Sequence, residues 1–308
     1  MNEKIFIAGQ EGMVGQAIYN LLKKKNYNVI HCARKKLDLT DQKQVQIWFK
    51  KNKPTIVINA AGKVGGILDN SLYPDKYLYV NTTIGLNLLK NALDYNVKQF
   101  INLGSACIYP KKTKQPIKEE YLLSSKLEES NEGYAIAKIA VLKYCEYIQK
   151  KLKKNFFSLQ PANLYGEGDN FNLKSSHVIP ALLRKFHEGN IKKKKIVEVW
   201  GSGLIKREFL NAKDLAEAVL FFINKKISIP YINIGGSDYI SIKNLALLIK
   251  KVTNFKGKIV FNKKYPDGVE ERKLDVSLIK RLGWTHKIKL EEGLKDYYKY
   301  FLTIQQLT

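Results

Sequence analysis

The sequence predicts an α/β protein built on a doubly wound parallel sheet, followed by a smaller α/β domain. In the first half of the 308 residues, short runs rich in Val, Ile and Phe alternate with longer segments of helical periodicity. Three glycines spaced three apart follow the first of these runs. Beyond about residue 165 the elements become shorter, and loops rich in Gly, Asn and Lys separate them. With 45% hydrophobic residues, the chain can bury one large core or two modest ones.

The predicted strands and helices of the first half follow one another in βαβ order. Buried strands are predicted over Ile5–Ala8, Asn28–His31, Ile56–Asn59, Phe100–Leu103 and Phe156–Leu159. Helices are predicted between them, over about Met13–Lys25, Gln42–Lys51, Pro74–Tyr95 and Asn131–Lys153. Because such units cross over right-handed, they build one parallel sheet with helices on both faces. Helices in the second half are predicted over Val178–Glu188, Lys213–Asn224, Ser241–Val252 and Leu290–Tyr300.

The formal net charge of +25 comes mainly from dispersed lysines. Of the 53 basic residues only five are arginine, namely Arg34, Arg184, Arg207, Arg272 and Arg281. A nucleic-acid-binding protein concentrates basic residues on one element beside aromatic side chains, so this pattern predicts a solvated surface and no nucleic-acid partner. A basic surface still attracts anionic small molecules such as nucleotides.

The chain has no apolar run long enough to span a bilayer, and its first residues lead directly into a strand without a secretory signal. The three cysteines, Cys32, Cys107 and Cys145, are odd in number and have no metal-like spacing. We therefore expect a cytoplasmic protein in a reducing compartment, with no membrane association, no disulfide and no metal site.

The glycine triplet Gly9, Gly12 and Gly15 follows the first strand and opens the first helix. In such a turn the first glycine permits the tight bend and the second allows a pyrophosphate to approach the backbone. The third allows the helix to pack closely on the strand. The pyrophosphate then meets the positive end of the helix, where Met13 and Val14 stand. The motif predicts a dinucleotide-binding domain of the Rossmann type over residues 1–165, with a return segment near 207–230, and a substrate-binding domain over 166–308.

The choice of cofactor is made near the end of the second strand, where an acidic residue selects the free ribose of NAD. Here Ala33 is followed by the three cations Arg34, Lys35 and Lys36. These cations favour a 2′-phosphate and hence NADP(H), although an ordinary basic loop in a lysine-rich chain is the alternative. Asp38, followed by Leu39, is predicted to accept hydrogen bonds from the adenine amino group.

Tyr134 and Lys138 lie four residues apart, on one face of a predicted helix. A free phenol titrates near ~10, and a neighbouring ammonium is expected to lower its pKa toward the working range of an acid–base catalyst. Ser105 follows the fourth strand, where its hydroxyl can hold a substrate carbonyl. A Tyr-x-x-x-Lys spacing also arises by chance, so the interpretation depends on its combination with Ser105 and the glycine triplet.

The chain resembles the GDP-L-fucose synthases of the extended short-chain dehydrogenase/reductase family from about Lys4 to about Leu302. The GxxGxxG spacing is typical of short-chain dehydrogenases, and an acidic pair expected after the serine in a 4,6-dehydratase is replaced by Ala106-Cys107. The segments that carry the resemblance are Asn59-Ala-Ala-Gly-Lys63-Val64-Gly65-Gly66, Gly104-Ser105-Ala106-Cys107-Ile108-Tyr109-Pro110, Asn131-Glu-Gly-Tyr134-Ala-Ile-Ala-Lys138, Asn163-Leu-Tyr-Gly, Asp169-Asn-Phe, Ser176-His177-Val-Ile-Pro-Ala-Leu-Leu-Arg184, Trp200-Gly-Ser-Gly and Arg207-Glu-Phe-Leu.

The resemblance implies reduction at C4 of a GDP-linked 4-keto-6-deoxy sugar by NADPH, together with epimerisation at C3 and C5. Cys107 and His177 match the family's two epimerisation residues, and Ser105 and Tyr134 match the pair that holds the ketone. Further cofactor contacts are implied for Ala60, Ala61, Lys138 and His177, and substrate contacts for Asn163, Lys185, Trp200, Arg207 and Arg272. The family also implies a homodimer through the helices over Pro74–Tyr95 and Asn131–Lys153.

Two alternatives remain on the same fold. Similar enzymes act only as C4 reductases, following separate epimerases, on modified heptoses. Retention of Cys107 and His177 does not distinguish the two activities. A non-catalytic NADPH-binding protein is the more remote alternative, because such a protein would have lost Tyr134 or Lys138.

Overall fold

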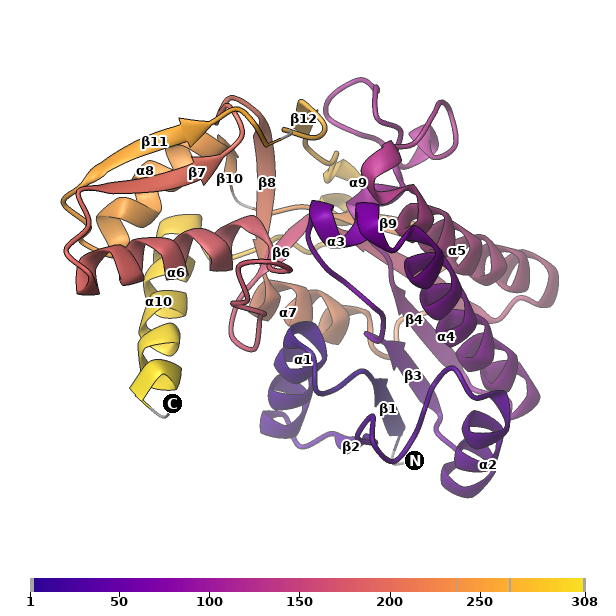
Figure 1. The fold of residues 1–308 in the computed structure, drawn as a ribbon. Coiled ribbons are helices and arrows are strands. Elements are labelled where there is room, and N and C mark those ends of the chain that lie inside the picture. Colours follow the sequence, from indigo (N-terminus) through magenta and orange to yellow (C-terminus); the bar gives the residue numbers. More distant parts are fainter. Residues whose placement is uncertain (1–2, 237, 266, 307–308) are drawn as a thin grey trace.

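The computed structural model describes residues 3–236, 238–265 and 267–306. At its centre lies a six-stranded sheet in the order β2-β1-β3-β4-β5-β9, with every neighbouring pair parallel. The predicted doubly wound sheet is therefore confirmed (Figure 1). Its strands are β1 (Lys4–Ala8), β2 (Asn28–Ile30), β3 (Ile56–Asn59), β4 (Gln99–Leu103), β5 (Asn155–Pro161) and β9 (Tyr231–Ile234).

Helices cover both faces of this sheet. Successive strand residues point to opposite faces, so Ile5 and Ile7 pack in one core with α1 and α7, and Phe6 and Ala8 in another with α2 and α4. The helices α4 and α5 lie against each other on the outside of the molecule (Figure 1). The bounds are α1 (Met13–Lys24), α2 (Gln42–Asn52), α4 (Pro74–Asp94), α5 (Glu132–Leu152) and α7 (Ala212–Phe222).

The strand β9 has no counterpart among the predicted strands. It is four residues long, follows the predicted return segment, and contains the polar Asn233 in its centre. Asn233 is nevertheless buried, because its amide accepts a hydrogen bond from the Tyr109 hydroxyl at 2.6 Å and donates one to the Ile117 carbonyl at 3.0 Å. Burial of a polar side chain with its partners satisfied is a tertiary effect that a short sequence run does not reveal.

The second half of the chain builds a separate layer around a third core of buried side chains. In the sheet here, β8 pairs with β6, β10 and β12, and a two-stranded sheet joins β7 to β11. The strands are β6 (Asn163–Tyr165), β7 (Ile196–Trp200), β8 (Lys206–Asn211), β10 (Asp238–Ser241), β11 (Lys258–Asn262) and β12 (Glu271–Arg272). The helices are α6 (Val178–Ile191), α8 (Ile242–Val252) and α10 (Leu290–Gln306).

Short helices complete the structure: α3 (Ile67–Leu72), α9 (Ser277–Arg281) and the 3₁₀ turns η1 (Ala106–Ile108), η2 (Glu119–Tyr121) and η3 (Glu129–Asn131). Within the described ranges, no helix combines the length and apolar character needed to cross a membrane. The same ranges contain no group of three or more His, Cys, Asp or Glu side chains arranged to hold a metal ion.

Candidate active site

The glycine turn after β1 closes tightly on the segment that follows β3. Gly9 adopts the left-handed region with φ +84°, and a Cβ there would lie 2.6 Å from the Ala61 Cα. A Cβ on Gly15 would lie 2.0 Å from the Gly9 carbonyl oxygen. Both positions therefore require glycine, whereas a Cβ on Gly12 would meet only the Gly9 carbonyl oxygen, at 3.5 Å.

The first turn of α1, which begins at Met13 and Val14, is open to an anion. Gly12 caps it without a side-chain hydrogen bond, and the turn contains no acidic residue. Backbone N–H groups at a helix start need acceptors and favour negative charge. Such a turn can accept a dinucleotide pyrophosphate, which is the role that the spacing of the glycines predicts for it.

The loop after β2 presents the three predicted cations to solvent. Arg34, Lys35 and Lys36 are exposed, and the Arg34 backbone N–H donates to the Glu11 Oε2 at 2.9 Å. In the described ranges the only ion pair between an arginine and a carboxylate is that of Arg184 with Glu188, so the Arg34 guanidinium is available for a phosphate.

Asp38 is held by its own turn. Its Oδ1 accepts hydrogen bonds from the Thr40 backbone N–H at 2.8 Å and from the Thr40 hydroxyl at 2.7 Å. These bonds keep the pKa of Asp38 below its usual range. The next carbonyl, that of Leu39, accepts from the Asn87 amide at 2.9 Å, which ties this loop to α4. Asp38 is thus a charged, fixed acceptor, although one of its oxygens is already occupied.

Tyr134 and Lys138 stand one turn apart on α5 and meet Ser105 beyond the end of β4. The Ser105 hydroxyl lies near the Tyr134 phenol and acts to lower its pKa. The Lys138 ammonium donates to the Leu103 carbonyl at 3.0 Å and lies 5.7 Å from the centre of the Tyr134 ring. Ser105 Oγ also accepts from the Cys107 backbone N–H at 3.2 Å. The structure thus brings together these four sequence-predicted residues.

The expected lowering of the Tyr134 pKa by Lys138 is wrong for this arrangement. Burial, followed by an electrostatic contribution from Cys107, raises the Tyr134 pKa, and the neighbouring Ser105 hydroxyl opposes this only in part. Burial also lowers the pKa of Lys138 to about 8, because the ammonium is desolvated. A raised pKa keeps the phenol protonated at neutral pH, which is the form that donates a proton.

Ser105 is supported by Gln160, a residue that sequence reasoning missed. The Gln160 Oε1 accepts from the Ser105 backbone N–H at 2.9 Å, and a Cβ on Gly104 would lie 1.9 Å from the same oxygen. Gln160 is fully buried near the end of β5. A polar residue directly after an apolar strand run, at the edge where ligands bind in parallel sheets, was the signal available in the sequence.

Two arginines of the second layer converge near the Cys107 turn. Arg272 pairs with Arg207 across β12 and β8, is 6% exposed, and donates through Nη1 to the Ala106 carbonyl at 2.8 Å. Its Nη2 is buried without a hydrogen-bond partner. Burial and the neighbouring charge of Arg272 lower the pKa of Arg207 to about 10. A buried and a partly buried guanidinium, neither with an ion-paired carboxylate in the described ranges, form a strong site for an anion.

The residue after Arg207 on β8 is a buried carboxylate, Glu208, which binds the segment that follows β12. Its Oε2 accepts from the Leu274 backbone N–H at 2.9 Å, and the side chain is 4% exposed. Burial raises its pKa from 4.5 to about 7 despite this hydrogen bond. Between pH 4.5 and about pH 7, the folded state therefore binds more protons than the unfolded state. The free energy of unfolding is expected to fall as the pH rises through this range.

We expect Glu208→Gln to raise the free energy of unfolding relative to the wild type by about 1–3 kcal/mol more at pH ~8 than at pH ~5. The reason is that glutamine keeps an acceptor but does not ionise. Thermal unfolding of both proteins at the two pH values measures this difference. Glu120→Gln, at an exposed side chain, is the control and should show no such dependence. Equal shifts in melting temperature at both pH values would show that Glu208 does not titrate in this range.

Trp200 and Lys185 form a second cluster beside the arginines. The Lys185 ammonium lies 4.7 Å from the Trp200 ring centre and donates to the Glu198 carbonyl at 3.1 Å, and burial lowers its pKa. Tyr265 stacks on Trp200 at 4.1 Å between ring centroids.

The loop after β11 contributes Asp267, whose Oδ1 accepts from the Ser202 N–H at 2.7 Å and whose charge acts on Arg207. Asn163 is tied to β8, because its amide donates to the Glu208 carbonyl at 3.0 Å.

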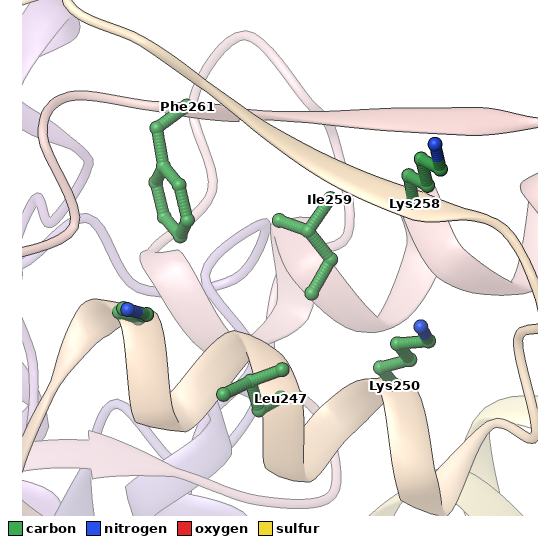
Figure 2. A pocket seen from close by; sticks show the side chains of 6 residues that line it. Leu247, Lys250, Lys258, Ile259 and Phe261 are labelled. Atoms are coloured by element: carbon green, nitrogen blue, oxygen red, sulfur yellow. The ribbon is translucent and has the colours of Figure 1, made fainter.

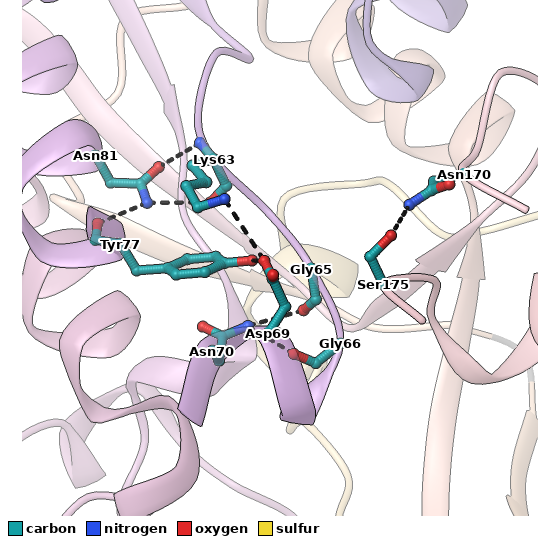
Figure 3. Close-up of polar contacts among 9 residues, drawn as sticks. All are labelled: Lys63, Gly65, Gly66, Asp69, Asn70, Tyr77, Asn81, Asn170 and Ser175. Carbon is teal, nitrogen blue, oxygen red and sulfur yellow. Dashed lines mark hydrogen bonds and ion pairs between the residues drawn. The ribbon is translucent and has the colours of Figure 1, made fainter. Parts of the chain in front are cut away.

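A glycine-containing loop after β3, residues 62–66, connects the two layers. Figure 3 shows the Asn81 amide accepting a hydrogen bond from the Lys63 N–H, at 2.9 Å, and donating one to the Lys63 carbonyl, at 3.0 Å. The Lys63 ammonium pairs with the Asp69 carboxylate at 3.5 Å. The Tyr77 hydroxyl donates to the same carboxylate, and its ring meets the Tyr134 ring at 6.2 Å. Lys63 belongs to the motif that follows β3, and the residues that support it come from α3 and α4.

His177 stands at the start of α6 and is exposed. The preceding loop touches the 62–66 loop, because the Gly66 N–H donates to the Ser175 carbonyl at 3.0 Å. Asn170, in the same loop, donates to the Ser175 hydroxyl (Figure 3). Burial raises the pKa of Asp169, and the charge of His177 opposes this rise. His177 thus stands on the second layer, after a loop that is hydrogen-bonded to the first layer.

A groove of about 340 Å³ lies elsewhere, between α8 and β11. Figure 2 shows Ile259 and Phe261 extending from β11 toward Leu247 on α8. The lysines that complete its lining are Lys243, Lys250 and Lys258. Because none of the predicted site residues lines this groove, it is separate from the candidate active site.

Comparisons with known proteins agree with this geometry. Residues 5–235 match the model of the NAD dependent epimerase/dehydratase family. A GDP-L-fucose synthase from Sinorhizobium fredii is 44% identical over 301 residues, which cover 98% of this chain and 96% of that protein.

Two solved structures are similar over the whole chain. One is a GDP-6-OMe-4-keto-L-xylo-heptose reductase from C. jejuni, with a TM-score of 0.92, 35% identity and 98% coverage of both chains. The other is a GDP-mannoheptose C4 reductase from Campylobacter jejuni with NADP bound, with a TM-score of 0.88, 36% identity and 98% coverage of both chains.

Proposed function

This chain belongs to the NAD dependent epimerase/dehydratase family, and we propose that it reduces C4 of a GDP-linked 4-keto-6-deoxy sugar with NADPH and epimerises C3 and C5. The observation that carries the proposal is the proximity of the Ser105 hydroxyl to the Tyr134 phenol, with Cys107 on the same turn as Ser105. These three residues can hold a ketone, protonate its oxygen and exchange a neighbouring proton.

NADP(H) is the proposed cofactor. The glycine turn and the open start of α1 hold the pyrophosphate, and Arg34 lies where the 2′-phosphate is expected. One solved relative contains NADP. When bound, NADPH supplies the hydride that reduces C4 of the sugar. The backbone of Ala60 and Ala61, which lies against Gly9, and the Lys138 ammonium are placed to orient it.

The catalytic roles of the side chains follow from their chemistry. Tyr134 is protonated at neutral pH and donates its proton to the ketone oxygen, which Ser105 holds. A 4-keto group acidifies the protons at C3 and C5. The Cys107 thiol and the His177 imidazole remove and return these protons, while Ser105 and Tyr134 stabilise the enolate oxygen.

The GDP diphosphate is proposed to bind Arg207 and Arg272. Both guanidiniums lack an ion-paired carboxylate in the described ranges, and the buried Arg272 Nη2 has no hydrogen-bond partner. A diphosphate supplies the negative charge and the acceptors that this pair needs. Lys185, Trp200 and Asn163 complete the proposed pocket on the nucleotide side.

We expect Arg207→Met to raise the KM for the GDP-sugar about 30-fold or more, because a charged contact to the diphosphate is lost. The Kd of NADPH should stay the same, since Arg207 lies in the second layer and the cofactor turn in the first. Steady-state kinetics and cofactor titration measure the two values. Arg184→Met, at an arginine already paired with Glu188, is the control. An unchanged KM would remove Arg207 from the diphosphate site.

A second candidate function is reduction at C4 alone, on a GDP-4-keto-heptose. The observation that favours it is that two solved heptose reductases match this chain over 98% of both chains. Sequence identity favours the first candidate, because the fucose synthase is 44% identical and the heptose reductases 35% and 36%.

Turnover in heavy water tests both candidates. The protein is mixed with NADPH and either GDP-4-keto-6-deoxymannose or a GDP-4-keto-heptose, and the products are analysed by mass spectrometry and NMR. The main proposal predicts NADPH oxidation with the hexose and deuterium at C3 and C5 of the product. Oxidation without label would leave a C4 reductase alone, and no oxidation with either sugar would overturn the proposed reaction.

The protein is proposed to act as a homodimer through α4 and α5. Both helices lie on one outer face (Figure 1), and they expose an apolar stripe there. Its members are Leu78, Tyr79 and Leu86 on α4 and Ile136 and Tyr147 on α5, of which Tyr79 and Tyr147 are 67% and 60% exposed. Pairing these helices with those of a second copy would bury the stripe in a four-helix seam.

We also propose a cytoplasmic location, where the three free cysteines stay reduced.

We expect the double variant Tyr79→Asp, Ile136→Asp to sediment and scatter light as a single 35.4 kDa chain, because the two carboxylates would be buried in the seam. The wild type should have twice this mass. Leu247→Asp, at an exposed apolar residue of the groove between α8 and β11, is the control and should remain dimeric. A monomeric wild type, or a dimer in all three proteins, would contradict this arrangement.

A further inference from the structure

Glu11 links the glycine turn to the loop after β2. It lies between Gly9 and Gly12, and its Oε2 accepts from the Arg34 backbone N–H at 2.9 Å. In the described part of the chain, no hydrogen bond to its other oxygen, Oε1, is found. Glu11 and Arg34 are both exposed, so the free carboxylate oxygen is open to solvent and to a ligand.

This position matters because of what occupies it in dinucleotide-binding folds. The adenosine ribose lies at the end of the second strand, where a carboxylate accepts from the 2′-hydroxyl of NAD and an arginine accommodates the 2′-phosphate of NADP. The loop from His31 to Lys36 contains no acidic residue. Glu11 nevertheless places a carboxylate at this loop from the neighbouring turn.

We infer that Glu11 is a cofactor-specificity residue. Its carboxylate repels the 2′-phosphate of NADP(H) and accepts a hydrogen bond from the 2′-hydroxyl of NAD(H), which reduces the preference of this chain for NADP(H) over NAD(H). This inference rests on the proposed function, since it concerns the cofactor of that reaction. Arg34, Lys35 and Lys36 attract the phosphate, and Glu11 acts against them from the same loop. A single like charge near a solvent-exposed phosphate weakens its binding by roughly tenfold.

The test is Glu11→Gln, which removes the charge and keeps an acceptor for the Arg34 N–H. Calorimetric titration of the purified protein with NADP⁺ and with NAD⁺, without sugar, gives both Kd values independently of turnover. We expect the affinity for NADP⁺ to rise about tenfold and that for NAD⁺ to change by less than about threefold. Asp94→Asn removes the same charge at the far end of α4, where Asp94 pairs with Lys90, and should change neither Kd.

Salt provides a second readout. Because the inferred repulsion is between exposed charges, the advantage of Glu11→Gln for NADP⁺ should shrink between about 25 mM and 300 mM NaCl. A purely structural effect through the Arg34 hydrogen bond would change both cofactors alike and would not depend on salt in this way.

The outcomes separate this inference from the proposed function. A ratio of NADP⁺ to NAD⁺ affinity that changes by less than about twofold in Glu11→Gln would overturn the role of Glu11, even though both cofactors bind. Equal changes for both cofactors would overturn it as well. Failure of the wild type to bind either dinucleotide would overturn the proposed function together with the inference.

Discussion

Replacing Tyr134 with phenylalanine is expected to lower kcat for C4 reduction about 10³-fold or more, while the Kd of NADPH stays within about twofold. The substitution removes only the hydroxyl that lies near Ser105, so the ketone oxygen loses its proton donor. The ring contact with Tyr77 and the packing of α5 are retained. Single-turnover absorbance of NADPH measures the hydride step, and fluorescence titration measures cofactor binding.

A matched control lies on the same helix. Tyr144→Phe removes a phenol hydroxyl from a residue further along α5 that packs against the core shared with α2 and α4, and it should leave turnover unchanged. If Tyr134→Phe retained more than about a tenth of the wild-type rate, another group would have to donate the proton. Loss of activity with loss of NADPH binding would point instead to a disturbed site.

The second large effect is expected at Cys107, where substitution by serine should slow deuterium incorporation at C3 and C5 about 100-fold or more. A thiol ionises near ~8.5, whereas a serine hydroxyl has no accessible ionisation at neutral pH. The turn itself should survive, because the Cys107 backbone N–H, not the thiol, binds Ser105. Mass spectrometry of the sugar after incubation in heavy water measures the label.

Reduction should be affected far less than exchange in this variant when the substrate already has the product configuration at C3 and C5. Cys32→Ser, which changes a cysteine in the loop after β2, is the control for thiol loss and should exchange normally. Unaltered labelling in Cys107→Ser would assign the proton transfer to another residue. His177→Asn then becomes the decisive variant, because His177 is the other proposed base.

Much of the fold could be predicted from sequence, because local patterns determine it. The five predicted strands and the helices between them appear within two residues of their predicted ends, since burial on both faces demands apolar runs and the helices need amphipathic periodicity. The strand β9 was missed, because its central Asn233 is polar and is buried only by virtue of its hydrogen bonds with Tyr109 and Ile117. In the second half only helices were predicted, and α10 continues six residues beyond its predicted end at Tyr300.

In the candidate active site, too, some features could be predicted from local sequence and others could not. Spacing within one element predicted that Tyr134 and Lys138 share a helix face and that Gly9 and Gly15 form a close turn. The residues that support them come from distant segments, as Gln160 does for Ser105. No local pattern encodes such a contact, because it depends on which strands become neighbours.

The sequence by itself determined the chemistry that is available: a phenol and an ammonium at helical spacing, a thiol beside a serine, and a glycine turn at a helix start. Only the tertiary structure decided the charge states and partners. Burial of Tyr134 reversed the expected direction of its pKa, and the pairing of β8 with β12 brought Arg207 beside Arg272. The physical reason is that desolvation and long-range electrostatics depend on packing between segments far apart in the chain, whereas helix and turn formation depend on neighbouring residues.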